Sequence, residues 1–247
     1  MLVPLAGAAA DMCAGLLGEP QVFFEVPLAA GVPDMVVVAF DNEVARRRLA
    51  AGLSPVVDAV AVRALVALGA DVQDVRDLAT RAGVSPGHLS RRVLPGLVST
   101  GWVELGAGGV VNVRHAYEPV VSWAVSVEAK RREWAKAVGQ AHRHLPSADR
   151  VFVALDSAYA GRAVENATYL AGTGVGVVTV NASPVAPSAA VDVVTLPKPN
   201  RPRLPRGHRG TNPAAKALLG ERAWDLELAG RRTGPTYPVY GRNLALA

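Results

Sequence analysis

Residues 120–130 read VVSWAVSVEAK, and this stretch decides the fold. Its first part is mostly apolar and rich in valine, a pattern that favours a buried β-strand. We therefore expect a strand over residues 120–128, with Glu128-Ala129-Lys130 at its end. Successive side chains of a strand point to opposite faces, so Glu128 and Lys130 lie on one side and Ala129 on the other. A carboxylate and an amine are thus expected together at the end of a buried strand.

Further strands and helices are expected on both sides of this stretch. Residues 34–40 (DMVVVAF) predict a second buried strand, and Pro33 is tolerated at its start because the missing N–H matters least there. The turn-rich segment PLAAGVP just before it predicts a hairpin. The other expected elements are a helix over 4–17, a strand over 21–26, a helix over 131–144, a strand over 151–155, a helix over 160–172, strands over 175–180 and 191–196, and a short helix around 213–229.

With residues 41–117 set aside, the expected order is helix, strand, strand, strand, helix, strand. Pro33-Asp34 begins the second of these strands, and Glu128-Ala129-Lys130 ends the third. This arrangement resembles the PD-(D/E)XK nuclease superfamily, the fold of many restriction and repair endonucleases, over residues 4–180. The family motif is short and degenerate, and the order of elements adds to it. The resemblance implies an α/β, restriction-endonuclease-like core, residues 1–40 plus 118–196, with a mixed central sheet flanked by helices.

The resemblance also implies a divalent-metal site. Phosphodiester hydrolysis uses a hard cation to neutralise charge at the phosphate and to activate water. Mg²⁺ prefers oxygen ligands and usually takes one or two carboxylates from the protein. Asp34 and Glu128 are therefore the predicted ligands of Mg²⁺ (or Mn²⁺), with the Ala129 carbonyl as a further ligand by resemblance. Lys130 is predicted to hold the attacking water and to stabilise developing negative charge.

Two more residues join the predicted catalytic set. Gln140 follows Lys130 by ten residues, on the next helix, where many members of the superfamily carry a glutamine that faces the site. Glu25, on the first strand, would add a carboxylate. The accessory acid of the family often comes from the first helix. Here that helix contains Asp11, and Glu19 lies just after the end of the helix.

Residues 41–117 are expected to form an inserted DNA-reading module. Residues 81–105 read RAGVSPGHLSRRVLPGLVSTGWVEL, with Ser85 as the N-cap of a helix over 86–100 and a Gly-rich hairpin after it. The stretch resembles the helix-turn-helix and wing of MarR-like regulators, in which the second helix of the pair enters the major groove of double-stranded DNA. The predicted DNA-binding residues are His88, Ser90, Arg91, Arg92, Asn112 and Arg114.

The net charge of +5 does not by itself predict nucleic-acid binding. Six cations and no acid lie between Asp192 and Glu221, so the rest of the chain carries no net positive charge. Any DNA contact must therefore depend on local patches. The segment 197–247 begins with a basic, Pro-rich stretch that predicts either a non-specific phosphate contact or a solubilising linker.

The single cysteine and the short apolar runs exclude several classes of protein. Cys13 is the single cysteine of the 247 residues, which excludes internal disulfides and a cysteine zinc site. No apolar run approaches the roughly 20 residues of a membrane span, and no basic residue precedes Arg46, so we expect a cytoplasmic protein without a membrane partner.

The sequence leaves three functions open. The first is a metal-dependent DNA endonuclease of restriction, defence or repair, and a homodimer would allow one site per chain to cut both strands. The second is a DNA-binding transcriptional regulator whose nuclease-like domain is inactive and serves as a scaffold. The third is a protein-interaction adaptor that neither binds nor cuts DNA.

Overall fold

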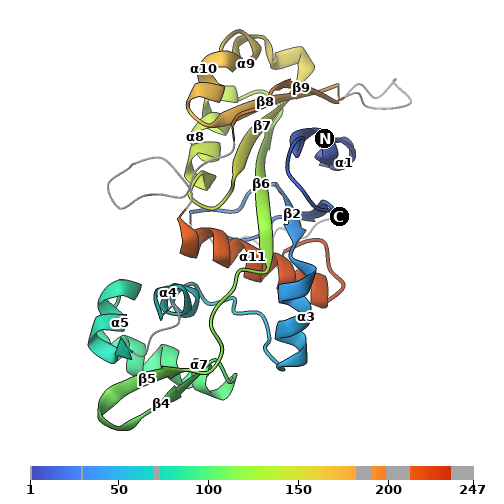
Figure 1. Ribbon diagram of the computed structural model, residues 1–247. Coiled ribbons are helices and arrows are strands. Elements are labelled where there is room, and N and C mark those ends of the chain that lie inside the picture. Colours follow the sequence, from blue (N-terminus) through green and yellow to red (C-terminus); the bar gives the residue numbers. More distant parts are fainter. Residues whose placement is uncertain (1, 29, 69–72, 182–190, 199–211, 235–247) are drawn as a thin grey trace.

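A computed structural model describes residues 2–234 except 29, 69–72, 182–190 and 199–211 (Figure 1). The described part is an α/β structure with a mixed six-stranded sheet flanked by helices and a separate three-stranded sheet. We call the six-stranded sheet with its helices the sheet body, and the three-stranded sheet with its helices the small body. The predicted α/β class and mixed central sheet are confirmed.

The six-stranded sheet has the strand order β1-β2-β6-β7-β8-β9. The first three strands of this order pair antiparallel, β6, β7 and β8 pair parallel, and β9 returns antiparallel. The strand predicted over residues 120–128 is confirmed as β6, which extends to Lys130 and lies in the interior of the sheet. The strands are β1 (Gln21–Phe24), β2 (Met35–Phe40), β6 (Val121–Lys130), β7 (Arg150–Asp156), β8 (Val175–Val180) and β9 (Val191–Thr195).

Helices cover both faces of this sheet. Helices α1 (Leu2–Gly7) and α2 (Ala9–Met12) pack on the face that carries Val125 and Val127. The opposite face is covered by α8 (Trp134–His144), α9 (Gly161–Glu165) and α10 (Ala167–Gly172) over β7 and β8, and by α11 (Pro213–Leu228) over β1, β2 and the start of β6. Ser126 and Glu128 alternate with Val125 and Val127, so they lie on this second face.

Two predicted helices are wrong in their extent. The helix expected over 4–17 is two short helices that end at Met12, where buried Arg150 donates hydrogen bonds to the carbonyls of Met12 and Ala14 (3.1 and 2.7 Å). The helix expected over 160–172 is interrupted at Asn166, whose side-chain amide donates to the Arg162 carbonyl at 2.7 Å. In both places a side chain donates to backbone carbonyls at the end of the helix, a contact that local periodicity does not reveal.

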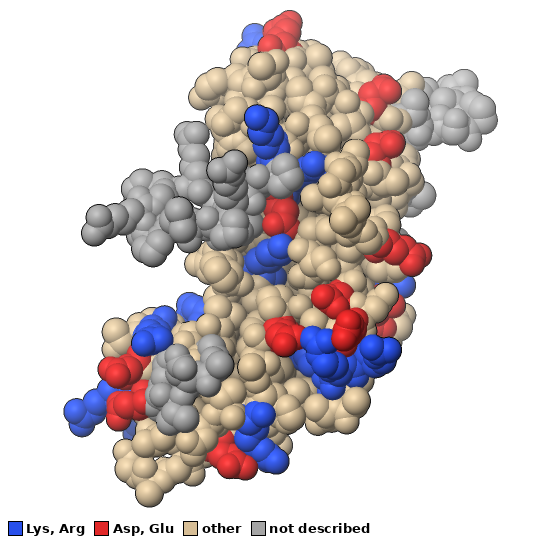
Figure 2. Space-filling view, viewed as in Figure 1, with Lys and Arg blue, Asp and Glu red and all other residues tan. Residues whose placement is uncertain are grey.

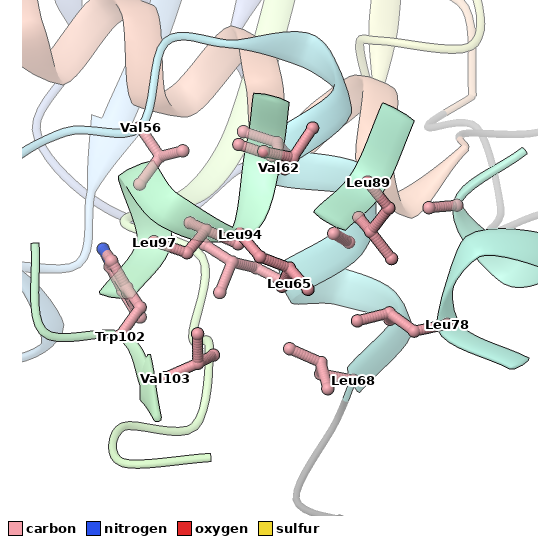
Figure 3. Close-up of a cluster of buried hydrophobic side chains, with 14 of the residues drawn as sticks. Val56, Val62, Leu65, Leu68, Leu78, Leu89, Leu94, Leu97, Trp102 and Val103 are labelled. Atoms are coloured by element: carbon pink, nitrogen blue, oxygen red, sulfur yellow. The ribbon is translucent and has the colours of Figure 1, made fainter. Parts of the chain in front are cut away.

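The small body has its own apolar core, built around Leu65, Leu94 and Trp102 (Figure 3). Its sheet has the order β3-β5-β4, and the two-residue strand β3 was not predicted. Ser85 Oγ accepts from the His88 N–H at 3.2 Å, so its predicted N-cap role is confirmed. The elements are α4 (Ala59–Leu68), β3 (Gln73–Asp74), α5 (Val75–Ala82), α6 (Pro86–His88), α7 (Leu94–Ser99), β4 (Val103–Leu105) and β5 (Val110–Val113).

The helix expected over 86–100 changes its winding within its length. Residues Leu89–Val93 form a π-helical turn between α6 and α7. Pro95 lies one turn after Arg91 and has no N–H for the Arg91 carbonyl, so the regular α-helical ladder cannot continue there. Short π-helical segments of this kind are frequent at functional sites.

Helix α11 contributes to both bodies (Figure 1). Ala217 and Leu218 pack in the core of the small body, whereas Leu219, Ala223 and Leu226 pack against the sheet. The helix is therefore apolar on several sides rather than along one stripe.

A buried ion pair connects α11 to helix α3 (Asn42–Ala50), which the sequence analysis did not predict. Arg48 donates to both carboxylate oxygens of Glu221, at 2.6 and 2.9 Å, and the two side chains are 5% and 0% exposed. Glu221 also accepts from the Val56 N–H at 2.7 Å and the Tyr117 hydroxyl at 2.8 Å. One carboxylate thus holds both chain segments that connect the small body to the sheet body. We call this group the Arg48–Glu221 joint.

Two tryptophans complete the joint. The Arg48 guanidinium lies 4.7 Å from the ring centre of Trp102 and 4.4 Å from that of Trp224, within cation–π distance of both. Trp102 belongs to the small body and Trp224 to α11. The relative placement of the two bodies therefore depends on buried polar and aromatic contacts.

Candidate functional site

Three charged side chains, two from the end of β6 and one from just before β2, meet at one edge of the sheet. Lys130 Nζ lies 2.6 Å from Glu128 Oε1 and 3.6 Å from Asp34 Oδ2. We call Asp34, Glu128 and Lys130 the acid–lysine cluster. The structure brings together the three residues that the sequence analysis placed at the centre of its predicted site.

The pairing of β2 with β6 creates this convergence. Met35 is the register partner of Val127, so Asp34, one residue earlier, lies beside the end of β6. The Ala129 N–H donates to Asp34 Oδ2 at 2.7 Å, which holds the carboxylate against that strand. The Ala129 carbonyl accepts from Lys130 Nζ at 3.3 Å, so it also faces the cluster.

The cluster has a buried base and a more open mouth. The Glu128 side chain is 2% exposed, whereas Asp34 and Lys130 are 31% and 26% exposed. Water therefore reaches Asp34 and Lys130, while Glu128 depends on protein partners for its charge.

Because their surroundings differ, the pKa values of the two carboxyl groups shift in opposite directions. Burial, followed by the charge of Glu128, raises the pKa of Asp34 above its ordinary value, against the Ala129 N–H and Lys130, which lower it. Burial also opposes the charge of Glu128, but attraction to His144 and Lys130 outweighs it, so the pKa of Glu128 lies below its ordinary value. Burial disfavours the Lys130 ammonium, yet its two acidic neighbours raise its pKa overall. The surroundings therefore favour the charged forms of Glu128 and Lys130 and disfavour the charged form of Asp34.

His144 is a fourth member that sequence reasoning missed. Its Nε2 lies 3.6 Å from Glu128 Oε2, and its side chain is 3% exposed. His142 and His144 are two residues apart on the helix and so face different sides, which gave His144 no predicted role as a metal ligand. A usable signal was present, because Ala137 and Ala141 precede His144 at helical spacing and define the buried face of α8.

The structure does not connect Gln140 or Glu25 to the cluster. Gln140 lies on α8 one turn before His144, and its Oε1 is buried. Glu25 follows β1 with a left-handed backbone (φ 51°), and its N–H donates to the Asp34 carbonyl at 3.3 Å. Among the described residues, no hydrogen bond or ion pair joins the side chain of either residue to the acid–lysine cluster. Their predicted roles stay predictions.

The donor set of the cluster would fit one kind of metal site. Within the described part of the chain, no three or more His, Cys, Asp or Glu side chains form a group that could hold a metal ion by themselves. Asp34 and Glu128 offer two carboxylates, which is the number Mg²⁺ commonly takes from a protein when water and phosphate oxygens complete its shell. Glu128 Oε2 is buried without a hydrogen bond, so it keeps an acceptor position. A hard cation that shares its ligands with substrate fits this set, and a closed four-ligand zinc site does not.

The neighbouring strand β7 ends in another carboxylate, that of Asp156. Its oxygens accept from the Ala158 N–H at 3.0 Å and from Arg131 Nε at 3.4 Å. Asp156 therefore caps the turn after its strand.

The predicted DNA-binding residues lie on the small body. His88, Ser90, Arg91 and Arg92 are exposed over α6 and the π-helical turn, while Leu89 and Val93 point into the core. Arg91 Nε donates to the Gly87 carbonyl at 3.2 Å, and within the described residues neither Arg91 nor Arg92 forms an ion pair.

The two predicted DNA-binding residues of the hairpin, Asn112 and Arg114, differ in their exposure to solvent. Asn112, on β5, is half-buried, and Arg114, just after this strand, is exposed and 3.2 Å from Glu104. Charges of both signs are interspersed over the face of the molecule shown in Figure 2. This face therefore offers local cationic positions rather than one continuous basic surface.

Comparison with protein-family models, with curated proteins and with solved structures found no match for this chain. Among the helices that the structure describes, none has the length and apolarity needed to cross a membrane. The predicted basic Pro-rich contact falls largely on residues 199–211, outside the described part of the chain.

Proposed function

We propose that the protein is a Mg²⁺- or Mn²⁺-dependent DNA endonuclease whose active site is the acid–lysine cluster. The single observation that supports the proposal is the convergence of two carboxylates and one lysine amine from strands separated by most of the small body in the sequence. The element order around the cluster is the order that the resemblance to PD-(D/E)XK nucleases implies.

Each residue of the cluster has a chemical role in this proposal. Asp34 and Glu128 would hold the cation, which supplies positive charge at the scissile phosphate and makes water easier to deprotonate. Lys130 carries three N–H donors on a partly exposed amine, so it can orient the attacking water and stabilise negative charge on the phosphate. Asp34, at the mouth, faces solvent from which substrate arrives.

The small body would position duplex DNA. In a winged helix-turn-helix the second helix of the pair lies in the major groove, and here that helix presents the exposed His88, Ser90, Arg91 and Arg92. Arg and Ser side chains bond to base edges and to phosphates. With one cluster per chain, cleavage of both strands would be carried out by a homodimer.

The test of catalysis is plasmid cleavage over a panel of divalent metals. We expect nicked or linear plasmid with Mg²⁺ or Mn²⁺ and not with EDTA. Lys130→Ala should abolish cleavage and leave DNA binding intact. Lys136→Ala is the matched control, because Lys136 is an exposed lysine on the adjacent helix that pairs only with Glu133 among the described residues. Cleavage that survives Lys130→Ala would refute the proposed site.

A specific observation favours a second function, that of a DNA-binding regulator with an inactive nuclease-like domain. Lys130 Nζ already pairs with an oxygen of each carboxylate, so both acids have a cationic partner without a metal. The double variant Arg91→Ala/Arg92→Ala should weaken duplex binding and reduce its salt dependence, whereas Arg162→Ala on the sheet body should not. A gel shift without cleavage under any metal would favour the regulator, and no gel shift at moderate salt would favour a protein adaptor.

A further inference from the structure

Each oxygen of Glu128 has a basic side chain beside it. Oε1 accepts from Lys130 Nζ at 2.6 Å, and Oε2 faces His144 Nε2 at 3.6 Å. Lys130 reaches the carboxylate from the open side of the cluster, since its side chain is 26% exposed, whereas His144 is buried with Glu128 in the interior. The histidine is therefore the internal partner of this carboxylate.

His144 Nε2 and Glu128 Oε2 are neighbours but do not form a hydrogen bond in this structure. A separation of 3.6 Å is longer than the roughly 3.2 Å limit of a good N–H···O hydrogen bond, and Glu128 Oε2 has no hydrogen-bond partner. A carboxylate accepts only, so the proton of a neutral imidazole is favoured on Nε2, with Nδ1 left as the acceptor nitrogen. His144 Nδ1 is buried and makes no hydrogen bond within the described structure, which leaves Nε2 as the nitrogen with a charged neighbour.

Metal binding would change the balance between the two partners. Lys130 Nζ contacts an oxygen of Asp34 and an oxygen of Glu128, the two carboxylates that would hold the cation. Because two positive charges repel at short distance, a cation bound there would compete with the Lys130 ammonium for these oxygens. His144 does not compete for them, because it approaches Glu128 at the other oxygen.

The surroundings of the ring keep it in place. His144 is the last residue of α8, on the face that Ala137 and Ala141 bury against the sheet. A Cβ on Gly31, in the loop between β1 and β2, would lie 3.5 Å from His144 Cε1, so that loop also lies close to the ring. A ring enclosed in this way can fix the orientation of the carboxylate beside it.

We propose that His144 is a positioning residue that fixes the Glu128 carboxylate for metal binding; this inference rests on the proposed function. In metal sites, a partner that hydrogen-bonds a carboxylate ligand usually contributes a factor of about 10–100 in metal affinity. We infer the same contribution from His144.

Two isosteric variants test the inference. In His144→Gln the amide nitrogen takes about the place of Nε2 and keeps a donor for Glu128. In His144→Asn the amide nitrogen takes about the place of Nδ1 and cannot reach it. His142→Asn is the control, because His142 lies on the same helix but pairs with Thr173 Oγ1 at 3.1 Å. The readout is Mn²⁺ affinity, measured by titration calorimetry on the full chain without DNA, with the melting temperature of each variant as a check on folding.

We expect His144→Asn to weaken Mn²⁺ binding about 10–100-fold, with affinity close to the unsubstituted chain in His144→Gln and His142→Asn. Equal losses in both His144 variants, or no loss in either, would overturn the positioning role while leaving metal-dependent cleavage by the unsubstituted chain as evidence for the nuclease. Absence of Mn²⁺ binding and of cleavage by the unsubstituted chain would overturn both proposals.

Discussion

Removing the charge of Glu221 should destabilise the protein more than any exposed substitution. The Glu221 carboxylate is fully buried and accepts four hydrogen bonds, two from Arg48 and one each from the Val56 N–H and the Tyr117 hydroxyl. Glu221→Gln keeps the shape but turns one acceptor into a donor and leaves the Arg48 charge without its partner. Breaking a buried ion pair on one side costs about 3–5 kcal/mol, which is a large part of the stability of an ordinary domain.

The assay is urea unfolding followed by tryptophan fluorescence and circular dichroism. Arg48 lies between the rings of Trp102 and Trp224, so fluorescence reports on the joint directly. Arg48→Met should lower the free energy of unfolding by a similar amount, about 3–5 kcal/mol. The double variant Glu221→Gln/Arg48→Met leaves no unpaired charge. Its loss in free energy of unfolding should therefore be smaller than the sum of the two single losses, by as much as about 3 kcal/mol. Single losses below about 1 kcal/mol, or strictly additive losses, would show that the joint is not a coupled pair.

Three further predictions concern separate parts of the molecule. Gly220→Ala should lower the free energy of unfolding by about 1–3 kcal/mol in chemical denaturation, since its Cβ would lie 2.6 Å from a side chain of β6. Gly139→Ala, on the open face of α8, should leave the free energy of unfolding unchanged or raise it. Equal effects of the two substitutions would contradict this account. The lowered pKa of Glu128 implies that its charge contributes to stability above the unfolded-state pKa and that this contribution is lost as the pH falls through the folded-state pKa. Lys130→Met should therefore flatten the rise of the melting temperature between about pH 3 and 5. An unchanged profile would exclude the coupling between Lys130 and Glu128. Burial raises the pKa of the Cys13 thiol to about 12 in spite of the Arg150 charge. A disulfide reagent at pH 8 should therefore label Cys13 only after unfolding. Rapid labelling of the native protein would refute the burial of this thiol.

The parts of the fold that the sequence could predict are those with strong local patterns. The runs at 35–40 and 175–180 are rich in apolar residues on both faces, which is the pattern of strands in the interior of a covered sheet. The run at 121–130 is valine-rich on one face and carries Ser126 and Glu128 on the other. The meeting of Asp34 with Glu128 followed from their places at adjoining strand ends. That inference needed the order of the strands, which came from a resemblance and not from the residues alone.

The parts that could not be predicted depend on distant partners. Helix α3 reads NEVARRRLA and buries only Val44 and Arg48, so it has almost no apolar stripe. Its one buried charge is stabilised by Glu221, 173 residues later in the sequence. His144 was missed for a related reason, because its role depends on the approach of a helix end to a strand. Periodicity within a window carries no information about such contacts.

The position of α11 in the chain bears on how the protein is made. Both apolar cores receive residues from this helix, yet the ribosome synthesises it after every strand and helix of the two bodies described above. A nascent chain that has reached residue 212 therefore has neither core complete, and exposed apolar surface of this kind attracts chaperones and promotes aggregation. For the same reason, a gene fragment that encodes only residues 41–117 would yield a unit that lacks Ala217, Leu218 and the carboxylate of Glu221, so dissection of this protein should carry the α11 segment along with the fragment.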